Sequence, residues 1–368
     1  MAILYFLLFI LIYSSLCFYA GFNGWRWLQA AFSFTYKKTY ILIIVLFSSA
    51  YIASYFIPSI LLELIGGYWL IIVGYSLILL PLVNLIYFAS KKRWKVPLGY
   101  VVSAFLLFVM IYGSYNAWSP VIREYEITID KSITEEDQEL TVLLAADLHI
   151  NDIIGENHMQ RLVHLSKKVE PDMILIPGDI IDDNIQPYID QGISDVMLQL
   201  RAQYGVYAVP GNHDYYGGDL MRLRAELEQI NIPLLMDEVI ISKNDIAIVG
   251  REDLTNFDRA SIAELIADIP EDMPIIMLDH QPVEIQEAAE HGVDLLVSGH
   301  THRGQVFPAN IITGLLFDND YGHLQIDDFH SFVTSGFGFW GPAVRFGTRS
   351  EIMVINITFT GEQASETE

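Results

Sequence analysis

Five short polar stretches contain His, Asp and Asn in patterns that could bind metal ions. Each follows an apolar run, and together they use five of the ten histidines. Imidazole, carboxylate and amide groups suit Mn, Fe or Zn, and a bridging carboxylate can hold two such ions. A single Asp-x-His or His-x-His is commonly incidental, whereas five ordered stretches predict a metal centre. The stretches are Asp147-Leu148-His149, Gly178-Asp179-Ile180-Ile181-Asp182, Gly211-Asn212-His213-Asp214, His280, and Gly299-His300-Thr301-His302.

The spacing within two of these stretches suggests which side chains reach the same site. In an extended chain, residues i and i+2 point to the same side. We therefore expect Asp147 and His149 to share one site, and His300 and His302 to point in one direction. The spacing alone does not say whether the two histidines bind one ion or two.

The apolar runs before these stretches predict buried strands that alternate with helices. Such alternation is typical of an α/β domain, in which ligand sites gather at the carboxyl ends of strands. Only the last few residues resemble a polar tail. We expect strands at 141–146, 173–177, 207–209, 274–278, 293–297, 330–335 and 351–359, a hairpin over 239–249, and helices at 157–169, 187–203, 220–230, 259–268 and 283–291.

The charge distribution divides the chain near residue 120. Residues 1–120 contain seven Lys/Arg and one acid, whereas residues 121–368 contain fourteen Lys/Arg and forty-four Asp/Glu, a net charge of −30. Long charge-free runs in the first region exceed the roughly 20 apolar residues that cross a bilayer. We therefore expect a membrane block over 1–120 and a water-soluble domain over 121–368. The expected transmembrane spans lie near 2–20, 39–57, 68–88 and 98–117.

Two alternatives to a membrane block are disfavoured. A cleaved signal peptide would need a basic segment before the first run, and three more spans follow it. A soluble helical domain would need helices with a polar face. The seven basic residues of the block all fall between spans 1 and 2 or between spans 3 and 4, so the positive-inside rule places the acidic domain outside the cytoplasm. They are Arg26, Lys37, Lys38, Lys91, Lys92, Arg93 and Lys95.

The ordered motifs resemble those of the calcineurin-like metallophosphoesterase superfamily. They are DLH, GDIID, GNHD, LDHQP around His280, and GHTHRGQ. The similarity covers roughly residues 140–357, and the closing GFGFWGPAVRFGTRSEI resembles a bacterial branch whose members are often membrane-attached. This resemblance implies a four-layer α-β-β-α sandwich, two sheets flanked by helices. The all-α block of about four transmembrane helices precedes this domain and lies outside the resemblance.

The resemblance also implies a centre with two divalent metal ions, which could be Mn, Fe or Zn. Two cations about 3.5–4 Å apart clamp a phosphate and lower the pKa of a water that becomes the nucleophile. Asp179 would bridge the ions. The other implied ligands are Asp147, His149 and His302 for one ion, and Asn212, His280 and His300 for the second.

His213 would protonate the leaving oxygen or stabilise the transition state. Asp182 resembles the family's partner carboxylate for this histidine, and Asp214 is a second candidate for orienting it. As alternatives, Asp182 could cap a turn and Asp214 could form an Asx-turn.

Substrate contacts are less defined by the sequence. Arg303, and with less support Arg345 and Arg349, could pair with phosphate through their guanidinium groups. The aromatic run that includes Phe337 and Trp340 could face a lipid or a base, or could pack against the sheet.

These patterns predict a membrane-anchored phosphoesterase that hydrolyses a phosphomonoester or phosphodiester by metal-bound hydroxide. Its location would suit lipid-linked or envelope-derived esters in a bacterial cell membrane, so the expected partners are a phosphoester and membrane lipid; no protein partner is inferable. An acidic domain disfavours nucleic acid, which needs clustered Lys/Arg. A membrane metal sensor or scaffold without turnover is the alternative. A transporter is disfavoured because the spans contain almost no ionisable residue.

Overall fold

The computed structural model describes residues 2–134 and 138–361, and the polar tail expected at the C-terminus falls largely outside them. The chain divides into two compact units. The first comprises Met1–Tyr115 with Gly341–Val344, and the second comprises Asn116–Trp340 with Arg345–Glu368.

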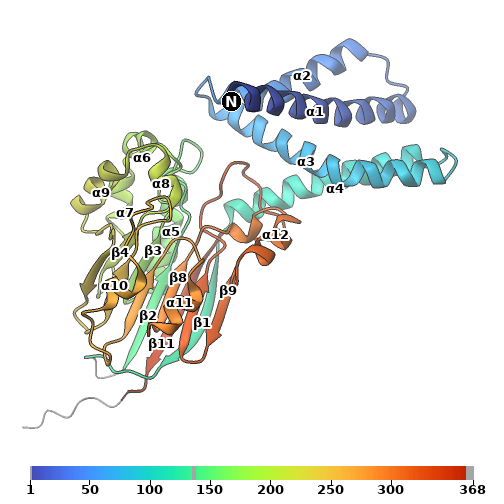
Figure 1. The fold of residues 1–368 in the computed structure, drawn as a ribbon. Coiled ribbons are helices and arrows are strands. Elements are labelled where there is room, and N and C mark those ends of the chain that lie inside the picture. Colours follow the sequence, from blue (N-terminus) through green and yellow to red (C-terminus); the bar gives the residue numbers. More distant parts are fainter. Residues whose placement is uncertain (1, 135–137, 362–368) are drawn as a thin grey trace, which may run out of the picture. The chain divides into compact units, whose positions relative to one another are not determined.

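The first unit is built from four long apolar helices. They are α1 (Ala2–Phe32), α2 (Lys37–Ser54), α3 (Ile60–Ala89) and α4 (Lys95–Trp118), shown in blue to cyan in Figure 1. All four are long and apolar enough to cross a membrane. The predicted block of four apolar helices is thus confirmed, although α1 extends to Phe32 and α3 begins at Ile60, both beyond the expected spans. Residues 55–57 lie beyond the end of α2, and Arg26 lies inside α1 rather than in a loop.

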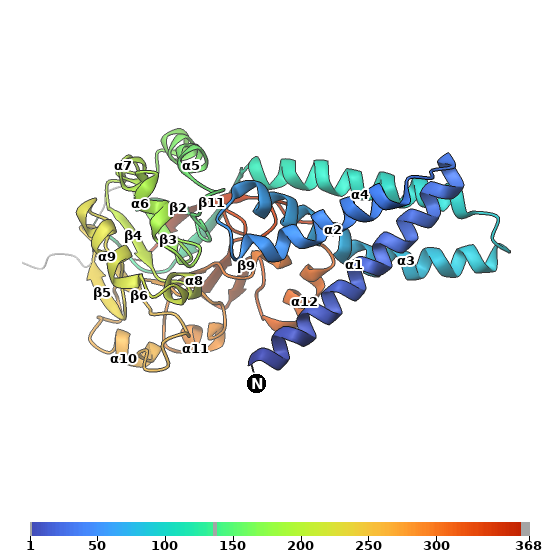
Figure 2. The same cartoon turned by 90° about the horizontal axis from the view of Figure 1, so that it is seen from above.

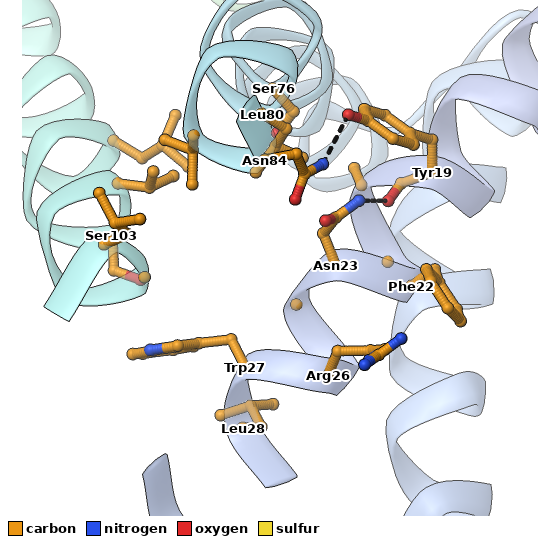
Figure 3. Close-up of a pocket in the computed structure, with 18 of the residues that line it drawn as sticks. Tyr19, Phe22, Asn23, Arg26, Trp27, Leu28, Ser76, Leu80, Asn84 and Ser103 are labelled. Carbon is orange, nitrogen blue, oxygen red and sulfur yellow. Dashed lines mark hydrogen bonds between the residues drawn. The ribbon is translucent and has the colours of Figure 1, made fainter. Parts of the chain in front are cut away.

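Helices α2 and α3 approach closely where α3 has no side chain. A Cβ built at Gly66 would lie 2.6 Å from the Cα of Tyr51, so only glycine permits this contact. Elsewhere the helices surround a cavity of about 480 Å³. Figure 3 shows Asn84 donating to the hydroxyl of Tyr19 (3.0 Å) and Asn23 donating to the Tyr19 carbonyl (2.9 Å) at its wall. These bonds satisfy amide groups that would otherwise be costly in an apolar environment.

The second unit contains two mixed β-sheets. The five-stranded sheet has the order β1-β11-β2-β3-β4, and the six-stranded sheet has the order β5-β6-β7-β8-β10-β9. The strands are β1 (Val121–Ile129), β2 (Glu139–Leu144), β3 (Met173–Pro177), β4 (Val206–Val209), β5 (Glu238–Ile241), β6 (Ala247–Gly250), β7 (Ile275–Leu278), β8 (Leu295–Ser298), β9 (Gly322–Ile326), β10 (Phe329–Val333) and β11 (Glu351–Phe359).

Helices cover the outer faces of both sheets. Figure 2 shows α5, α6 and α7 along the five-stranded sheet, and α10 and α11 along the other, which confirms the predicted α/β layers. The helices are α5 (Glu156–Val169), α6 (Gln186–Asp190), α7 (Ile193–Met197), α8 (Asn212–Tyr216), α9 (Leu220–Gln229), α10 (Ile262–Ile266), α11 (Ile285–Glu290) and α12 (Ala309–Leu316), with a 3₁₀ turn, η1, at His302–Gly304.

The core lies between the two sheets. Leu144 and Leu175 of one sheet share a buried cluster with Ile276 and Val297 of the other. Neighbouring side chains such as Met277 face the opposite way, toward α10 and α11. Because side chains alternate along a strand, each sheet buries both faces. This explains why the strands form continuous apolar runs in the sequence.

Several elements differ from the sequence-based expectation. The helix expected over 187–203 is two short helices separated at Gly192, whose φ of 61° ends the first one. Strand β1 was not predicted because its exposed positions carry Arg123, Glu124 and Glu126. Helices α8 and α12 and strand β9 are additional elements that were not predicted from the sequence.

Candidate metal centre

The predicted ligands all lie immediately after strands. Asp147 and His149 follow β2, Asp179 follows β3, Asn212 opens α8 after β4, His280 follows β7, and His300 and His302 follow β8. Carboxyl ends of neighbouring strands meet at one edge, so the fold brings together side chains that are far apart in sequence. All seven predicted ligands gather there.

The backbone at these positions is strained. Five of the seven predicted ligands have φ between 46° and 68°, in the left-handed region: Asp147, His149, Asp179, His300 and His302. Non-glycine residues rarely adopt this conformation, and such strain is concentrated at functional sites. The expectation of extended chain at Asp147–His149 and at His300–His302 was therefore wrong, because both residues of each pair have positive φ.

One cluster consists of Asp147, His149 and His302, all buried. The Nε2 atoms of the two histidines lie 3.0 Å apart, and Asp147 Oδ1 lies 3.6 Å from Nε2 of His302. Asp147 Oδ1 also accepts from the backbone N–H of His300 (2.9 Å), whereas its buried Oδ2 has no hydrogen-bond partner. Buried carboxylate oxygens are rarely left unpaired, so the free oxygen and the converging imidazoles fit a divalent cation.

A second cluster consists of Asp179, His280 and His300, with the Asn212 amide between the histidines. Asn212 Oδ1 lies 3.2 Å from Nε2 of His280 and 2.9 Å from Nδ1 of His300. The other ring nitrogen of His280 bonds the Pro177 carbonyl (2.9 Å), which fixes Nε2 toward the site. These donors also fit a divalent cation. The two groups of His and Asp could thus bind two ions, as predicted.

Asp179 lies between the two clusters. Its Oδ2 is 3.6 Å from Nε2 of His149 and 3.2 Å from Nε2 of His280. Burial opposes a charge on Asp179, but His280 and His149 outweigh burial and hold its pKa below the ordinary range. Burial and the charge of His280 lower the pKa of His300 to about 4.

His213 is held by two carboxylates rather than one. Its Nδ1 lies 2.7 Å from Asp183 Oδ1 and 3.3 Å from Asp182 Oδ1, and its backbone N–H donates to Asp179 Oδ1 (2.9 Å). Burial lowers the pKa of His213, but Asp182, Asp179 and Asp183 together raise it to about 9. Asp182 also lies 3.5 Å from Nδ1 of His149. The sequence analysis did not include Asp183, although the stretch GDIIDD shows a second acid directly after Asp182.

The structure assigns Asp214 a different role from the one considered in the sequence. Its side chain is buried and accepts backbone N–H groups of Ile180 (3.0 Å), Ile181 (2.9 Å) and Gly211 (2.8 Å). It therefore does not orient His213. Instead it ties the Asp179 loop to the loop that carries Asn212.

The arginines considered as phosphate contacts make other interactions. Arg345 is fully buried, with Nη2 3.0 Å from Nδ1 of His302 and 2.7 Å from the Gly338 carbonyl. Arg349 donates to the Ser119 carbonyl (2.7 Å). The Arg303 guanidinium stacks 4.3 Å from the ring centre of Tyr321. Arg345 thus supports a candidate ligand, and these contacts place neither Arg303 nor Arg349 within the two clusters.

The aromatic run divides into buried and exposed members. Phe337 and Phe339 are buried, whereas Trp340 is 56% exposed. The ring centres of Trp340 and Tyr216 lie 6.1 Å and 5.2 Å from that of His213. Exposed aromatic rings therefore flank the one candidate proton donor.

A buried ion cluster supports the His280 loop. Arg251 donates to Asp279 Oδ2 (2.8 Å) and to Glu284 Oε2 (2.6 Å), and Arg259 contacts the same two carboxylates. Removing one charge would leave its partners buried and unpaired, so the cluster fixes the loop that presents His280. Its members are far apart in sequence, and no local spacing indicated them.

Comparisons with known proteins identify similar chains. Residues 140–304 match the family model of the calcineurin-like phosphoesterases. A metallophosphoesterase of Helicobacter pylori is 31% identical over 247 residues, 65% of this chain and 64% of that protein. A transmembrane protein with a metallophosphoesterase domain from Danio rerio is 28% identical over 281 residues, 72% of this chain and 63% of that protein. Among solved structures, a dimetal phosphatase from Danio rerio has 15% identity and a TM-score of 0.34 over 53% of this chain and 86% of that chain.

The predicted resemblance to the calcineurin-like phosphoesterases is thus confirmed over residues 140–304, and it supports a metal-dependent phosphoesterase. The alignments span less than two thirds of the Helicobacter pylori and Danio rerio relatives. Four apolar helices, together with relatives named as transmembrane proteins, indicate membrane integration.

Proposed function

We propose that this protein is a membrane-anchored, two-metal phosphoesterase that hydrolyses a phosphomonoester or a phosphodiester. The observation that carries the proposal is the position of Asp179, whose Oδ2 lies near one imidazole nitrogen of each cluster. A carboxylate in this position can bridge two cations. In this proposal residues 1–120 form the anchor and residues 121–368 form the phosphoesterase domain.

Each cluster would hold one ion. When bound, the pair supplies charge stabilisation for the phosphate and a hydroxide nucleophile near neutral pH. The mixed nitrogen and oxygen donors suit Mn, Fe and Zn alike. The proposed ligands are Asp147, His149 and His302 for one ion and Asn212, His280 and His300 for the other, with Asp179 shared.

His213 would supply the proton for the leaving group. Asp182 and Asp183 lie at Nδ1, which keeps the imidazole protonated and leaves Nε2 as the donating atom. As the water oxygen forms its bond to phosphorus, the bond to the ester oxygen breaks and that oxygen takes the proton from Nε2. Asp182 and Asp183 act as positioning residues because they reach the reaction through His213.

We also propose that the phosphoesterase domain lies on the extracytoplasmic side of a bacterial cell membrane. The seven basic residues of the helical block all lie near the α1–α2 connection or the α3–α4 connection. Basic loops remain in the cytoplasm, so the opposite ends of the helices, and the domain after α4, would be outside. There the substrate would be a lipid-linked or envelope-derived phosphoester, with membrane lipid as a partner.

The hydrolysis proposal is tested on the full chain purified in detergent. Wild type and Asp179→Asn are compared with Mn²⁺ on model phosphomonoesters and phosphodiesters, and bound metal is measured in both. We expect hydrolysis and about two ions per chain only in the wild type. Equal activity in the two proteins would refute the proposal.

The orientation is tested separately with a reporter fused after Glu368 that works only in the cytoplasm. We expect no signal from this fusion, and a signal from the same reporter inserted between Lys92 and Arg93. A cytoplasmic signal from the C-terminal fusion would overturn the extracytoplasmic placement without affecting the proposed chemistry.

A further inference from the structure

Helix α12 presents its apolar side to solvent. It has no buried residue, and Ile311, Ile312, Leu315 and Leu316 are 55%, 59%, 81% and 72% exposed. At 3.6 residues per turn these four side chains lie within an arc of about 140°. Phe307, just before the helix, is also exposed. A helix on a soluble domain normally turns such a face inward.

The polar side of α12 faces the protein instead. Thr313 Oγ1 donates to Asp320 Oδ2 (2.7 Å), and Thr301 Oγ1 donates to the Asp320 carbonyl (2.7 Å). The start of the helix packs on Gly304, where a Cβ would lie 2.3 Å from the backbone nitrogen of Asn310. The outward apolar face is thus held in place by polar contacts on the other side.

The helix adjoins the metal centre. Gly304, on which α12 packs, lies two residues after the proposed ligand His302. Gln305 exchanges two hydrogen bonds with the backbone of Trp340 (2.8 and 2.9 Å), and the Trp340 ring lies beside His213. The loop before α12 therefore reaches both the ligands and the proposed proton donor.

Hydrogen bonds inside the second unit connect the segment before α12 with the C-terminal end of α4. The last residues of α4 include Asn116, which donates to the Arg345 carbonyl (3.1 Å) and accepts from the Ser350 N–H (3.1 Å). The neighbouring Phe346 accepts from the N–H of Phe307 (2.6 Å). Within the second unit, residues 345 and 346 therefore connect the C-terminal end of α4 with the segment before α12.

We propose that α12 and Phe307 form an interfacial element that inserts into the membrane surface, and that the metal centre acts on a phosphoester carried by a lipid. This inference rests on the proposed phosphoesterase function and names its class of substrate. Interfacial helices bury an apolar face at the boundary between headgroups and acyl chains. Insertion beside His302 and His213 would bring headgroup phosphates to the site.

Insertion here would depend on apolar contact rather than charge. Helix α12 contains no Lys or Arg, and Asp318 and Asp320 follow it. Anionic headgroups would therefore not be attracted to this face, and the docking should be insensitive to salt and should persist on zwitterionic lipid.

The docking is tested by fluorescence in the full chain reconstituted into phosphatidylcholine vesicles. In a Cys17→Ser background, Leu315→Cys carries a polarity-sensitive dye, and Phe257→Cys is the matched control because Phe257 is another apolar residue, 98% exposed. We expect lipids brominated in the upper acyl chain to quench the dye at residue 315 but not at residue 257. Iodide serves as the quencher in the water phase. The docking would be overturned if iodide quenched the dye at residue 315. It would also be overturned if neither iodide nor the brominated lipid quenched this dye, because the residue would then be covered by protein.

The substrate class is tested with the variant Ile312→Ser/Leu315→Ser/Leu316→Ser. Activity on a phospholipid in vesicles is divided by activity on a soluble ester, and we expect this ratio to fall at least about tenfold, since three aliphatic side chains no longer insert. An unchanged ratio would overturn the proposal that the substrate is a phosphoester carried by a lipid. If neither ester is hydrolysed by the wild type, the proposed function fails, and the quenching result still decides the docking.

Discussion

The two units place their apolar side chains in opposite directions. In the helical unit, residues such as Phe18 and Leu85 are 72% and 68% exposed, whereas strand residues such as Leu144 are fully buried. Burial of apolar surface stabilises both units, but the first requires lipid as its surroundings, whereas the second buries its own core. In the second unit, helix α12 resembles the helices of the first unit, because its apolar side chains are exposed to the surroundings.

Polar groups show the reverse contrast. The helical unit pairs some of the polar side chains in its spans between helices, as in Asn84 of α3 with Tyr19 of α1. The second unit concentrates buried Asp and His at one edge of its sheets and leaves Asp147 Oδ2 unpaired. An unpaired buried carboxylate oxygen costs free energy unless a ligand satisfies it, so this edge is built for binding rather than for stability.

The largest effect should come from neutralising the shared carboxylate. We expect Asp179→Asn to lower the rate of hydrolysis by more than about 100-fold. This loss exceeds the roughly 10–100-fold loss that is typical when a residue hydrogen-bonded to a metal ligand is mutated. Metal content per chain, measured by mass spectrometry, should fall with it. Asp258→Asn, which removes an exposed carboxylate, is the control and should retain full activity and metal. Full metal occupancy in Asp179→Asn would contradict the bridging role.

The next effect concerns proton donation. We expect His213→Asn to lower kcat by about 10²–10⁴-fold on esters with poor leaving groups. The loss should be much smaller for a nitrophenyl ester, whose leaving oxygen needs no proton. Comparing the two esters at constant metal occupancy is the measurement. An equal loss on both would indicate that His213 serves the site in another way.

A smaller effect should separate the two carboxylates beside His213. A proton donor must be protonated, so activity should fall as pH rises through its pKa, which is about 9 in the metal-free protein. Removing a carboxylate lowers that pKa, so Asp183→Asn should move the alkaline limb of the kcat profile to lower pH. Metal content should stay unchanged, because Asp183 is exposed and lies against His213 alone among the site histidines.

The matched variant Asp182→Asn should move the same limb and also weaken metal binding, because Asp182 contacts both His213 and His149. Identical behaviour of the two variants in metal titrations would show that the contact between Asp182 and His149 has no effect on the centre.

The smallest expected effect concerns the stability of the helical unit. We expect Gly66→Ala to destabilise it by about 1–3 kcal/mol, the usual cost of overpacking, because the added Cβ meets the backbone of Tyr51. Gly74→Ala, in the same helix with no atom within 4 Å of the new Cβ, is the control and should be neutral or stabilising. Thermal unfolding in detergent measures both, and phosphoesterase activity at low temperature should be retained.

The sequence predicted correctly those strands and candidate ligands that are marked by a pattern of neighbouring residues. Strand β3 coincides with the predicted range 173–177, because its five buried residues form one apolar run. The gathering of Asp147, Asn212 and His280 was predicted because each follows a strand of an α/β sheet. Sequence reasoning did not place Arg345 beside His302 or the Arg251 cluster behind His280, since those contacts depend on tertiary packing alone.

Spacing arguments were weaker where the backbone is unusual. His300 and His302 were assumed to lie in extended chain, but both have positive φ. Their place in different clusters agrees with the division that the family resemblance implied. Helix α12 was missed although its apolar residues have helical spacing, and its orientation is set by tertiary contacts such as Thr313 with Asp320.

The parallel pairing of β1 with β11 has a consequence for biogenesis. The two strands are in register from Val121 and Glu351 to Ile129 and Phe359, and β11 lies between β1 and β2 in the sheet. About 230 residues separate the partners, so the first strand after the helices gains its neighbour only when the last strand has been made. Until then β1 and β2 expose unpaired edges of the kind that promote aggregation. A nascent chain held at a membrane by its helices would therefore depend on chaperones, or on fast synthesis, until its final strand fills the gap.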